Sequence, residues 1–209
     1  MTLHSKRRVG LLGGTFDPIQ LAHMIIANEA WARLDLERVI FVPAGGPWRK
    51  EGRKVSLVEH RVAMVRLAIA DNPNFEMSLV EVERPGPSYT AETLLEMQGF
   101  LGEGVDMFFI LGADALYDLP QWKTPELIVE RCHLVTAARP GVSWRRLESI
   151  KRRLPGLESK LILLDAPRLD VSSSEIRRRV AARLPIRYLV PPAVEDYIEG
   201  HGLYKDRAY

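Results

Sequence analysis

Short apolar runs alternate with amphipathic segments along most of this 209-residue chain. Most runs are continuous stretches of aliphatic, β-branched and aromatic residues, as in buried strands, and one alternates apolar with polar residues, as in a half-buried strand. The expected strands are 9–12, 38–43, 75–79, 106–111, 134–137 and 161–164. Between them, apolar residues recur at helical spacing. The expected helices are 22–34, 57–70, 90–100 with Thr90 as its N-cap, 144–153 and 191–199.

Strands that alternate with helices predict an α/β fold with a doubly wound, mostly parallel, Rossmann-like sheet and right-handed crossovers. No internal repeat or linker interrupts the pattern, so we expect a single domain over 1–209, with a small C-terminal helical extension from about 165. Ligands of such sheets bind beyond the carboxyl ends of the strands where the strand order reverses, usually between the first and the fourth. Residues 13–23 follow the first strand and 112–114 follow the fourth, so both should face one crevice.

The turn after the first strand, residues 13–23, reads Gly-Gly-Thr-Phe-Asp-Pro-Ile-Gln-Leu-Ala-His. Adjacent glycines let backbone N–H groups approach a ligand, and the N-terminus of the next helix carries partial positive charge, so the turn suits a phosphate. His23 would lie in the first helical turn, where it could donate to that anion. Neither the P-loop nor the Gly-x-Gly-x-x-Gly spacing is present. The alternative is a structural turn with an incidental histidine.

Two later stretches carry further candidate chemistry. Ser172 and Glu175 have capping-box spacing, so a helix with serine hydroxyls and Arg177 near its start could bind a second anion, or could simply be a well-capped basic helix. Asp114 could accept hydrogen bonds from a ribose, or could cap a short helix, and Gly112 leaves room for a nucleotide.

The order of these motifs resembles that of the nucleotidylyltransferase superfamily, whose signature is Gly-Gly-x-Phe-Asp-Pro-x-His-x-Gly-His. Gln20 replaces the first histidine of that signature, and Ala22 replaces its last glycine. A late Ser-Ser-x-x-Ile-Arg motif of the superfamily matches 172–177. Residues 86–90 (Gly-Pro-Ser-Tyr-Thr) and 119–122 (Leu-Pro-Gln-Trp) resemble one branch of it, the bacterial nicotinate-nucleotide adenylyltransferases.

The resemblance implies adenylyl transfer from ATP to nicotinate mononucleotide, a step of NAD biosynthesis, with Mg²⁺ held chiefly by the triphosphate and no metal site in the protein. It implies that His23 contacts the α-phosphate, Gln20 the bridging region and Arg177 the β- and γ-phosphates. The implied ATP-binding residues are Gly13, Gly14, Thr15, Phe16, His23, Gly112, Asp114, Ser173, Ser174 and Arg177. The implied nicotinate mononucleotide-binding residues are Lys50, Ser88, Tyr89, Thr90, Trp122 and Arg139. The indole of Trp122 would stack on the pyridine ring, or would anchor its own loop.

Composition sets the remaining limits. The formal net charge is +2, which does not imply nucleic acid, and the basic residues of the last third are either solvated helix faces or a funnel for small polyanions. Cys132 is the only cysteine, which excludes an internal disulfide and fits a reducing compartment. Neither a signal-peptide core nor a membrane-length apolar run is present, so we expect a cytoplasmic protein that binds no membrane. A homo-oligomer is compatible with the sequence.

Three other functions compete with this interpretation. The first is the same chemistry on another acceptor, such as nicotinamide mononucleotide, phosphopantetheine or a small alcohol phosphate. The second is a nucleotide-binding protein with impaired catalysis, suggested by Gln20 and Ala22. The third, an RNA-binding module, is disfavoured because no aromatic platforms lie among the late arginines.

Overall fold

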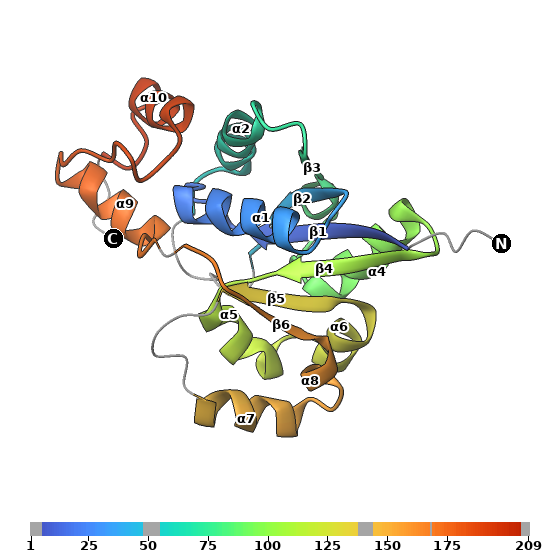
Figure 1. Cartoon of the computed structure of the whole chain (residues 1–209). Helices are drawn as coiled ribbons and strands as arrows, with labels where there is room; N and C mark the ends of the chain where they lie inside the picture. Colours follow the sequence, from blue (N-terminus) through green and yellow to red (C-terminus); the bar gives the residue numbers. More distant parts are fainter. Residues whose placement is uncertain (1–5, 48–54, 138–143, 168, 206–209) are drawn as a thin grey trace.

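A six-stranded sheet forms the centre of the molecule in a computed structural model that describes residues 6–47, 55–137, 144–167 and 169–205. The strand order is β3-β2-β1-β4-β5-β6, and neighbouring strands are parallel throughout (Figure 1). The strands are β1 (Arg7–Gly14), β2 (Arg38–Pro43), β3 (Phe75–Met77), β4 (Val105–Ile110), β5 (His133–Ala137) and β6 (Leu161–Leu164). The α/β prediction is confirmed, and the strand order reverses between β1 and β4 as expected.

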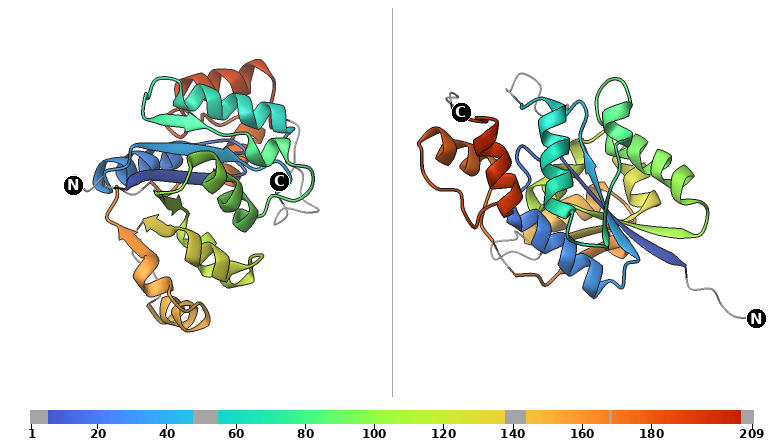
Figure 2. Two further views of the ribbon diagram at one scale, coloured as in Figure 1. Left: turned by 90° about the vertical axis from the view of Figure 1, so that its right-hand side faces the viewer. Right: turned by 90° about the horizontal axis from the view of Figure 1, so that it is seen from above.

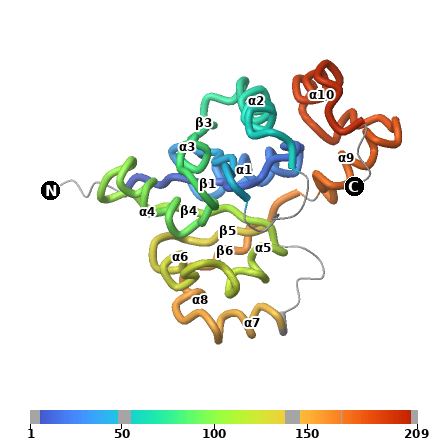
Figure 3. Tube along the Cα trace, turned by 180° about the vertical axis from the view of Figure 1, so that it is seen from behind, coloured from blue at the N-terminus to red at the C-terminus, as the bar shows by residue number. Residues whose placement is uncertain are grey.

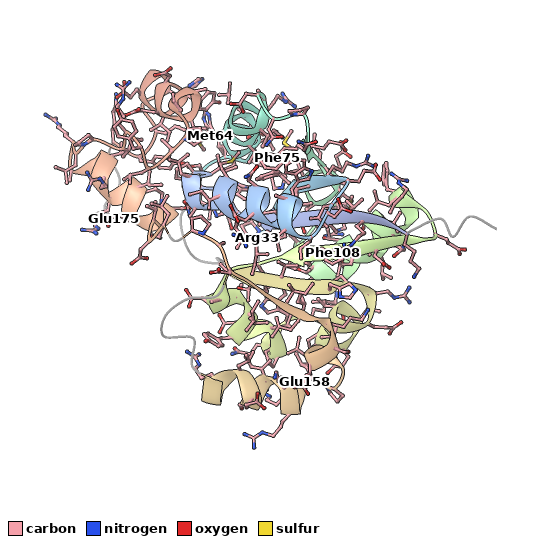
Figure 4. All side chains as sticks on the ribbon, in the orientation of Figure 1. Arg33, Met64, Phe75, Phe108, Glu158 and Glu175 are labelled. Carbon is pink, nitrogen blue, oxygen red and sulfur yellow. The ribbon has the colours of Figure 1, made fainter. Side chains whose placement is uncertain are left out.

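Helices cover both faces of the sheet and enclose two separate apolar cores (Figures 1 and 3). Successive side chains of a strand point to opposite faces of the sheet, so Leu12 belongs to one core and Leu11 to the other. The helices are α1 (Leu21–Arg33), α2 (Val58–Ile69), α3 (Val80–Glu83), α4 (Thr90–Leu101), α5 (Ala113–Asp118), α6 (Pro125–Arg131), α7 (Trp144–Arg153), α8 (Leu157–Lys160), α9 (Ser173–Ala181) and α10 (Pro192–Gly200). The core that contains Leu12, called the first core below, also contains Met64 of α2 and Phe75 of β3, and both side chains are buried (Figure 4).

The C-terminal segment returns from the edge strand β6 to the side of the sheet that carries α1 and α2 (Figure 2). Helix α10 packs against α2, and Ile176, Val194 and Tyr204 share the first core with Phe16. The late serine and arginine motif is therefore held next to the turn after β1, although most of the chain separates them in sequence.

Two local predictions were wrong. Helix α4 does begin at Thr90, but the N-cap residue is Tyr89, and no side chain caps this end. Strand β3 stops at Met77, and a short helix, α3, follows it. A four-residue helix made of Val and Glu is too short to show a 3.6-residue period, which is why the pattern did not reveal it. No helix in the described ranges is both long and apolar enough to cross a bilayer.

Candidate active site

A cavity of about 550 Å³ opens at the carboxyl ends of β1 and β4. Gly13, Gln20 and His23 line it from the turn after β1, and Gly112 and Trp122 line it from the segment after β4. The two stretches that the strand order predicted to face one crevice therefore do so. A volume of this size is in the range of pockets that bind small molecules.

His23 is held in one orientation and one tautomer by the start of α1. It is the third residue of the helix, and the backbone N–H of Gln20 donates to its Nδ1 at 3.2 Å. Because Nδ1 accepts that bond, the proton of the neutral imidazole is on Nε2. Phe16 packs edge-on against the ring, with centroids 5.1 Å apart. The ring that lines the cavity is therefore preset with Nε2–H as its hydrogen-bond donor.

The side-chain amide of Gln20 makes two contacts within the protein. Its Oε1 accepts the Ala22 N–H at 2.6 Å, which caps α1, and its Nε2 donates to the Val171 carbonyl at 3.1 Å. The residue is 5% exposed. Gln20 thus links the start of α1 to the segment that leads into α9. This contact gives Gln20 a positioning role in addition to the substrate contact that the motif position predicts.

The first turn of α9 lies against the turn after β1 (Figures 1 and 3). Ser173 Oγ donates to the Pro18 carbonyl at 2.8 Å, and Arg177 donates to the Asp17 carbonyl at 2.7 Å and to Ser174 Oγ at 3.1 Å. Ser172 Oγ caps the helix by accepting the Glu175 N–H, as the capping-box spacing predicted. The start of α9 is therefore held against the turn whose residues line the cavity, whereas the lining on this side ends at Asp170 and includes none of Ser173, Ser174 and Arg177.

Asp114 lies in the first turn of α5 and is exposed. The N-cap position is Gly112, so the interpretation of Asp114 as the cap is wrong. Its neighbours Ala113 and Ala115 line the cavity, whereas Asp114 itself does not. The ribose contact of Asp114 stays a prediction.

A buried polar network, which sequence reasoning missed, holds the turn after β1. Arg61 of α2 is 1% exposed and donates to the carbonyls of Thr15 at 2.8 Å, Ser56 at 3.2 Å and Gly45 at 3.4 Å. Burial lowers the pKa of Arg61, and the nearby carboxylate of Asp17 opposes that shift. This one guanidinium joins the turn after β1 to both ends of the connection between β2 and α2.

Asp17 is the second member of this network. Tyr204 Oη donates to Asp17 Oδ1 at 2.8 Å, and the Ser56 N–H donates to Oδ2 at 3.3 Å. Asp17 belongs to the glycine-turn motif and Tyr204 to the C-terminal end, and each is buried. The only sequence signal for the pairing was an acidic residue inside the turn with no evident partner.

Residues predicted for the acceptor lie around Trp122 and the start of α4. The Trp122 indole packs edge-on against Phe109 as it lines the cavity. Lys123 Nζ lies 4.2 Å from the centre of the Tyr89 ring and pairs with Glu92 at 2.7 Å. Ser88 is buried, and Thr90 opens α4. The two other predicted residues, Lys50 and Arg139, lie outside the described ranges.

Comparison with known proteins adds to this geometry. Residues 11–179 match the model of the cytidylyltransferase-like family. A protein of Roseiflexus sp. (strain RS-1), named a probable nicotinate-nucleotide adenylyltransferase, is 48% identical over 96% of this chain and 100% of its own length. A protein of Thermomicrobium roseum with the same name is 43% identical over 95% of this chain and 92% of its own length. The chain belongs to the nicotinate-nucleotide adenylyltransferase family.

The fold agrees with that family. The nicotinic acid mononucleotide adenylyltransferase of Plasmodium falciparum, solved in complex with NaAD, superposes with a TM-score of 0.76 at 22% identity. The match covers 96% of this chain and 98% of that one. This member of the nicotinate-nucleotide adenylyltransferase family therefore shares the arrangement of strands and helices over nearly its whole length.

Proposed function

We propose that this protein transfers the adenylyl group of ATP to nicotinate mononucleotide and releases pyrophosphate. The observation that supports this most is that His23 at the start of α1 lines one cavity with Gly13 and Gly112, while the start of α9 is hydrogen-bonded to the same turn. A triphosphate needs several donors at separated points, and the turn and the start of α9 supply them from two directions.

In the proposed reaction, a phosphate oxygen of the acceptor attacks the α-phosphorus of ATP in line. The new P–O bond forms as the bond from the α-phosphorus to the oxygen that bridges to the β-phosphate breaks, and pyrophosphate leaves with that electron pair. His23 donates its Nε2–H to a nonbridging oxygen of the α-phosphate, where negative charge must be stabilised in the transition state. The fixed tautomer means that no reorientation is needed when the charge develops.

We assign the rest of the triphosphate to the turn and to α9. Backbone N–H groups of the turn at Gly13, Gly14, Thr15 and Phe16 would approach the phosphates. Ser173, Ser174 and Arg177 would take the β- and γ-phosphates. The bonds from Ser173 Oγ and Arg177 to the Pro18 and Asp17 carbonyls hold their helix start beside the turn, and Ser173 Oγ would exchange its bond to Pro18 for one to a phosphate oxygen. Gln20 would act mainly by holding α1 to that segment. The exposed carboxylate of Asp114 and the open backbone of Gly112 suit the ribose.

Mg²⁺ would enter with ATP. Triphosphate oxygens are the hard ligands that Mg²⁺ prefers, and it dehydrates reluctantly, so a nucleotide can carry most of its coordination. Within the described ranges, no group of three or more His, Cys, Asp or Glu residues could hold the ion by itself. The protein's part is therefore to bind and orient the magnesium nucleotide.

We assign the acceptor to the side of the cavity that Trp122 lines. The electron-rich face of the indole suits an electron-poor pyridinium ring. Ser88, Tyr89 and Thr90 would border that ring and its carboxylate. Lys50 and Arg139 complete the set of residues that we propose to bind nicotinate mononucleotide, and they are included because of their positions in the motifs alone.

The test is pyrophosphate release from ATP, measured in parallel with nicotinate and nicotinamide mononucleotide. We expect turnover with the acid and at least about 100-fold lower kcat/KM with the amide, because a site that pairs a carboxylate leaves its donors unpaired on a neutral group. Faster turnover with the amide would overturn the acceptor assignment. Tight ATP binding with no pyrophosphate release from either acceptor would favour a nucleotide-binding protein whose catalysis is impaired at Gln20 and Ala22.

A further inference from the structure

A buried carboxylate lies behind the proposed acceptor side of the site. Glu81 of α3 is 7% exposed, and Thr93 Oγ1 donates to its Oε1 at 2.7 Å. Ser88 is buried as well, and its hydroxyl favours the ionised form of this carboxylate. Burial raises the pKa of Glu81, while these two hydroxyls and the charge of Arg84 oppose the shift. Burying a carboxylate costs free energy, so a buried carboxylate with its own hydroxyl neighbours indicates a role other than filling space.

Ser88 transmits the position of this carboxylate to the loop after β2. The Ser88 N–H donates to the Gly46 carbonyl at 2.8 Å, and the Gly46 N–H donates to Ser88 Oγ at 3.2 Å. Because Ser88 Oγ accepts that bond, its hydroxyl proton is available to the Glu81 carboxylate, whose pKa it lowers. A bond between the two would complete a chain from Glu81 through Ser88 to the backbone of Gly46.

The backbones of these two segments also touch directly. A Cβ on Gly45 would lie 2.0 Å from the Glu81 carbonyl oxygen, and a Cβ on Gly46 would lie 2.7 Å from the Gly86 carbonyl oxygen. No side chain fits at either glycine without moving backbone. A change in the position of 81–88 must therefore displace the loop at 45–46.

The same segment reaches the cavity through Tyr89. Its ring contacts Lys123, and the preceding residue, Trp122, lines the cavity. Lys123 is fixed in turn by its ion pair with Glu92 in the first turn of α4. Residues 86–90 thus lie between the buried carboxylate and the wall that we assign to the pyridine ring.

We propose that Glu81 is a positioning residue for the acceptor: its carboxylate holds the Ser88 hydroxyl, and through it residues 86–90 and Gly46, in the arrangement that binds nicotinate mononucleotide. This inference rests on the proposed function. Glu81 contacts neither the turn after β1 nor α9 in any described hydrogen bond or ion pair, and Gly45 reaches that turn only through neighbours such as Arg61, so the loss of Glu81 should affect the acceptor side much more than the ATP side.

The test uses three substitutions and one control. Glu81→Gln keeps the shape but replaces one acceptor oxygen by a donor, so it cannot accept both hydroxyls through a carboxylate. Thr93→Val removes one hydroxyl, and Thr93→Ser keeps it. Glu83→Gln changes an exposed carboxylate on the same short helix. Each protein is first checked for an unchanged thermal midpoint or assayed well below it.

We expect Glu81→Gln to raise the KM for nicotinate mononucleotide by roughly tenfold, the scale of a lost charge-assisted hydrogen bond. The KM for ATP should stay within about twofold, and kcat should change much less than the acceptor KM. Thr93→Val should raise the acceptor KM in the same direction, whereas Thr93→Ser and Glu83→Gln should match wild type.

Two results would overturn the proposal. If Glu81→Gln has a wild-type KM for the acceptor, or if both KM values rise equally, Glu81 has no specific role on the acceptor side. The wild-type protein is measured first to separate this from the proposed function. If the wild-type protein shows no turnover with nicotinate mononucleotide, both the proposed function and the role of Glu81 are wrong. If wild type shows turnover but Glu81→Gln has an unchanged KM for nicotinate mononucleotide, only the role of Glu81 is wrong.

Discussion

Tyr204→Phe removes a single hydroxyl from the network beneath the glycine turn. Tyr204 is 3% exposed, and its Oη donates to Asp17 Oδ1 at 2.8 Å. Asp17 is itself 2% exposed and keeps one other described donor, the Ser56 N–H at 3.3 Å. The phenylalanine ring fills the same space, so the change isolates the hydrogen bond from packing.

The expected cost follows from the charge and the burial of the acceptor. A hydrogen bond to a charged group contributes about 1.5–3 kcal/mol, and a buried acceptor that loses its donor also loses solvation it cannot recover. We therefore expect Tyr204→Phe to lower the free energy of unfolding by about 2 kcal/mol. For a chain of this length, that corresponds to a fall of about 4–8 °C in Tm.

Urea denaturation followed by circular dichroism measures this change directly. Tyr188→Phe is the matched control, because Tyr188 is 79% exposed and the same atom is removed there. We expect the control to stay within about 0.5 kcal/mol of wild type. A Tyr204→Phe protein equally close to wild type, with the same m-value, would show that the contact between Asp17 and the C-terminal end does not stabilise the turn.

Three further predictions concern single side chains. His23→Ala should lower kcat by about 10²-fold or more, since it removes a preorganised transition-state donor, and pyrophosphate release measures this; unchanged turnover would remove His23 from the mechanism. Burial raises the pKa of the Cys132 thiol to about 12, so a thiol reagent at about pH 8 should label it only after unfolding, and rapid labelling of the folded protein would contradict its burial. Burial, helped by the charge of Lys160, lowers the pKa of His133 from its ordinary 6.5, so the unfolded chain binds a proton more readily and stability should fall as pH drops below 6.5. Unfolding measured over about pH 5 to 8 should show this fall in wild type and a weaker one in His133→Gln, and identical profiles would refute it.

The parts of the site that could be predicted from the sequence depend on local contacts. The helix start at Ser172 shows in the spacing to Glu175 because a capping side chain bonds a backbone group three residues away. The glycine turn after β1 and the strand order around it follow from apolar runs and from the rules for parallel sheets. These signals sufficed to place residues 13–23 and Gly112 at one cavity.

The parts that could not be predicted depend on contacts over long separations. Arg61 bonds the Thr15 carbonyl 46 residues away, and Tyr204 bonds Asp17 across 187 residues. Backbone carbonyls carry no side-chain signature, so a helix pattern cannot show that an arginine will be buried among them. Glu81 was missed for a related reason, because its helix is four residues long and its partners lie in the next element.

A cocrystal structure with a nonhydrolysable ATP analogue and Mg²⁺ tests the central claim most directly. We predict one triphosphate between the two helix N-termini. A nonbridging oxygen of its α-phosphate should lie within hydrogen-bond distance of His23 Nε2, and its β- and γ-phosphates should contact Ser173, Ser174 and Arg177. A triphosphate that lies away from the start of α9, or a His23 ring that makes no contact with it, would contradict the account.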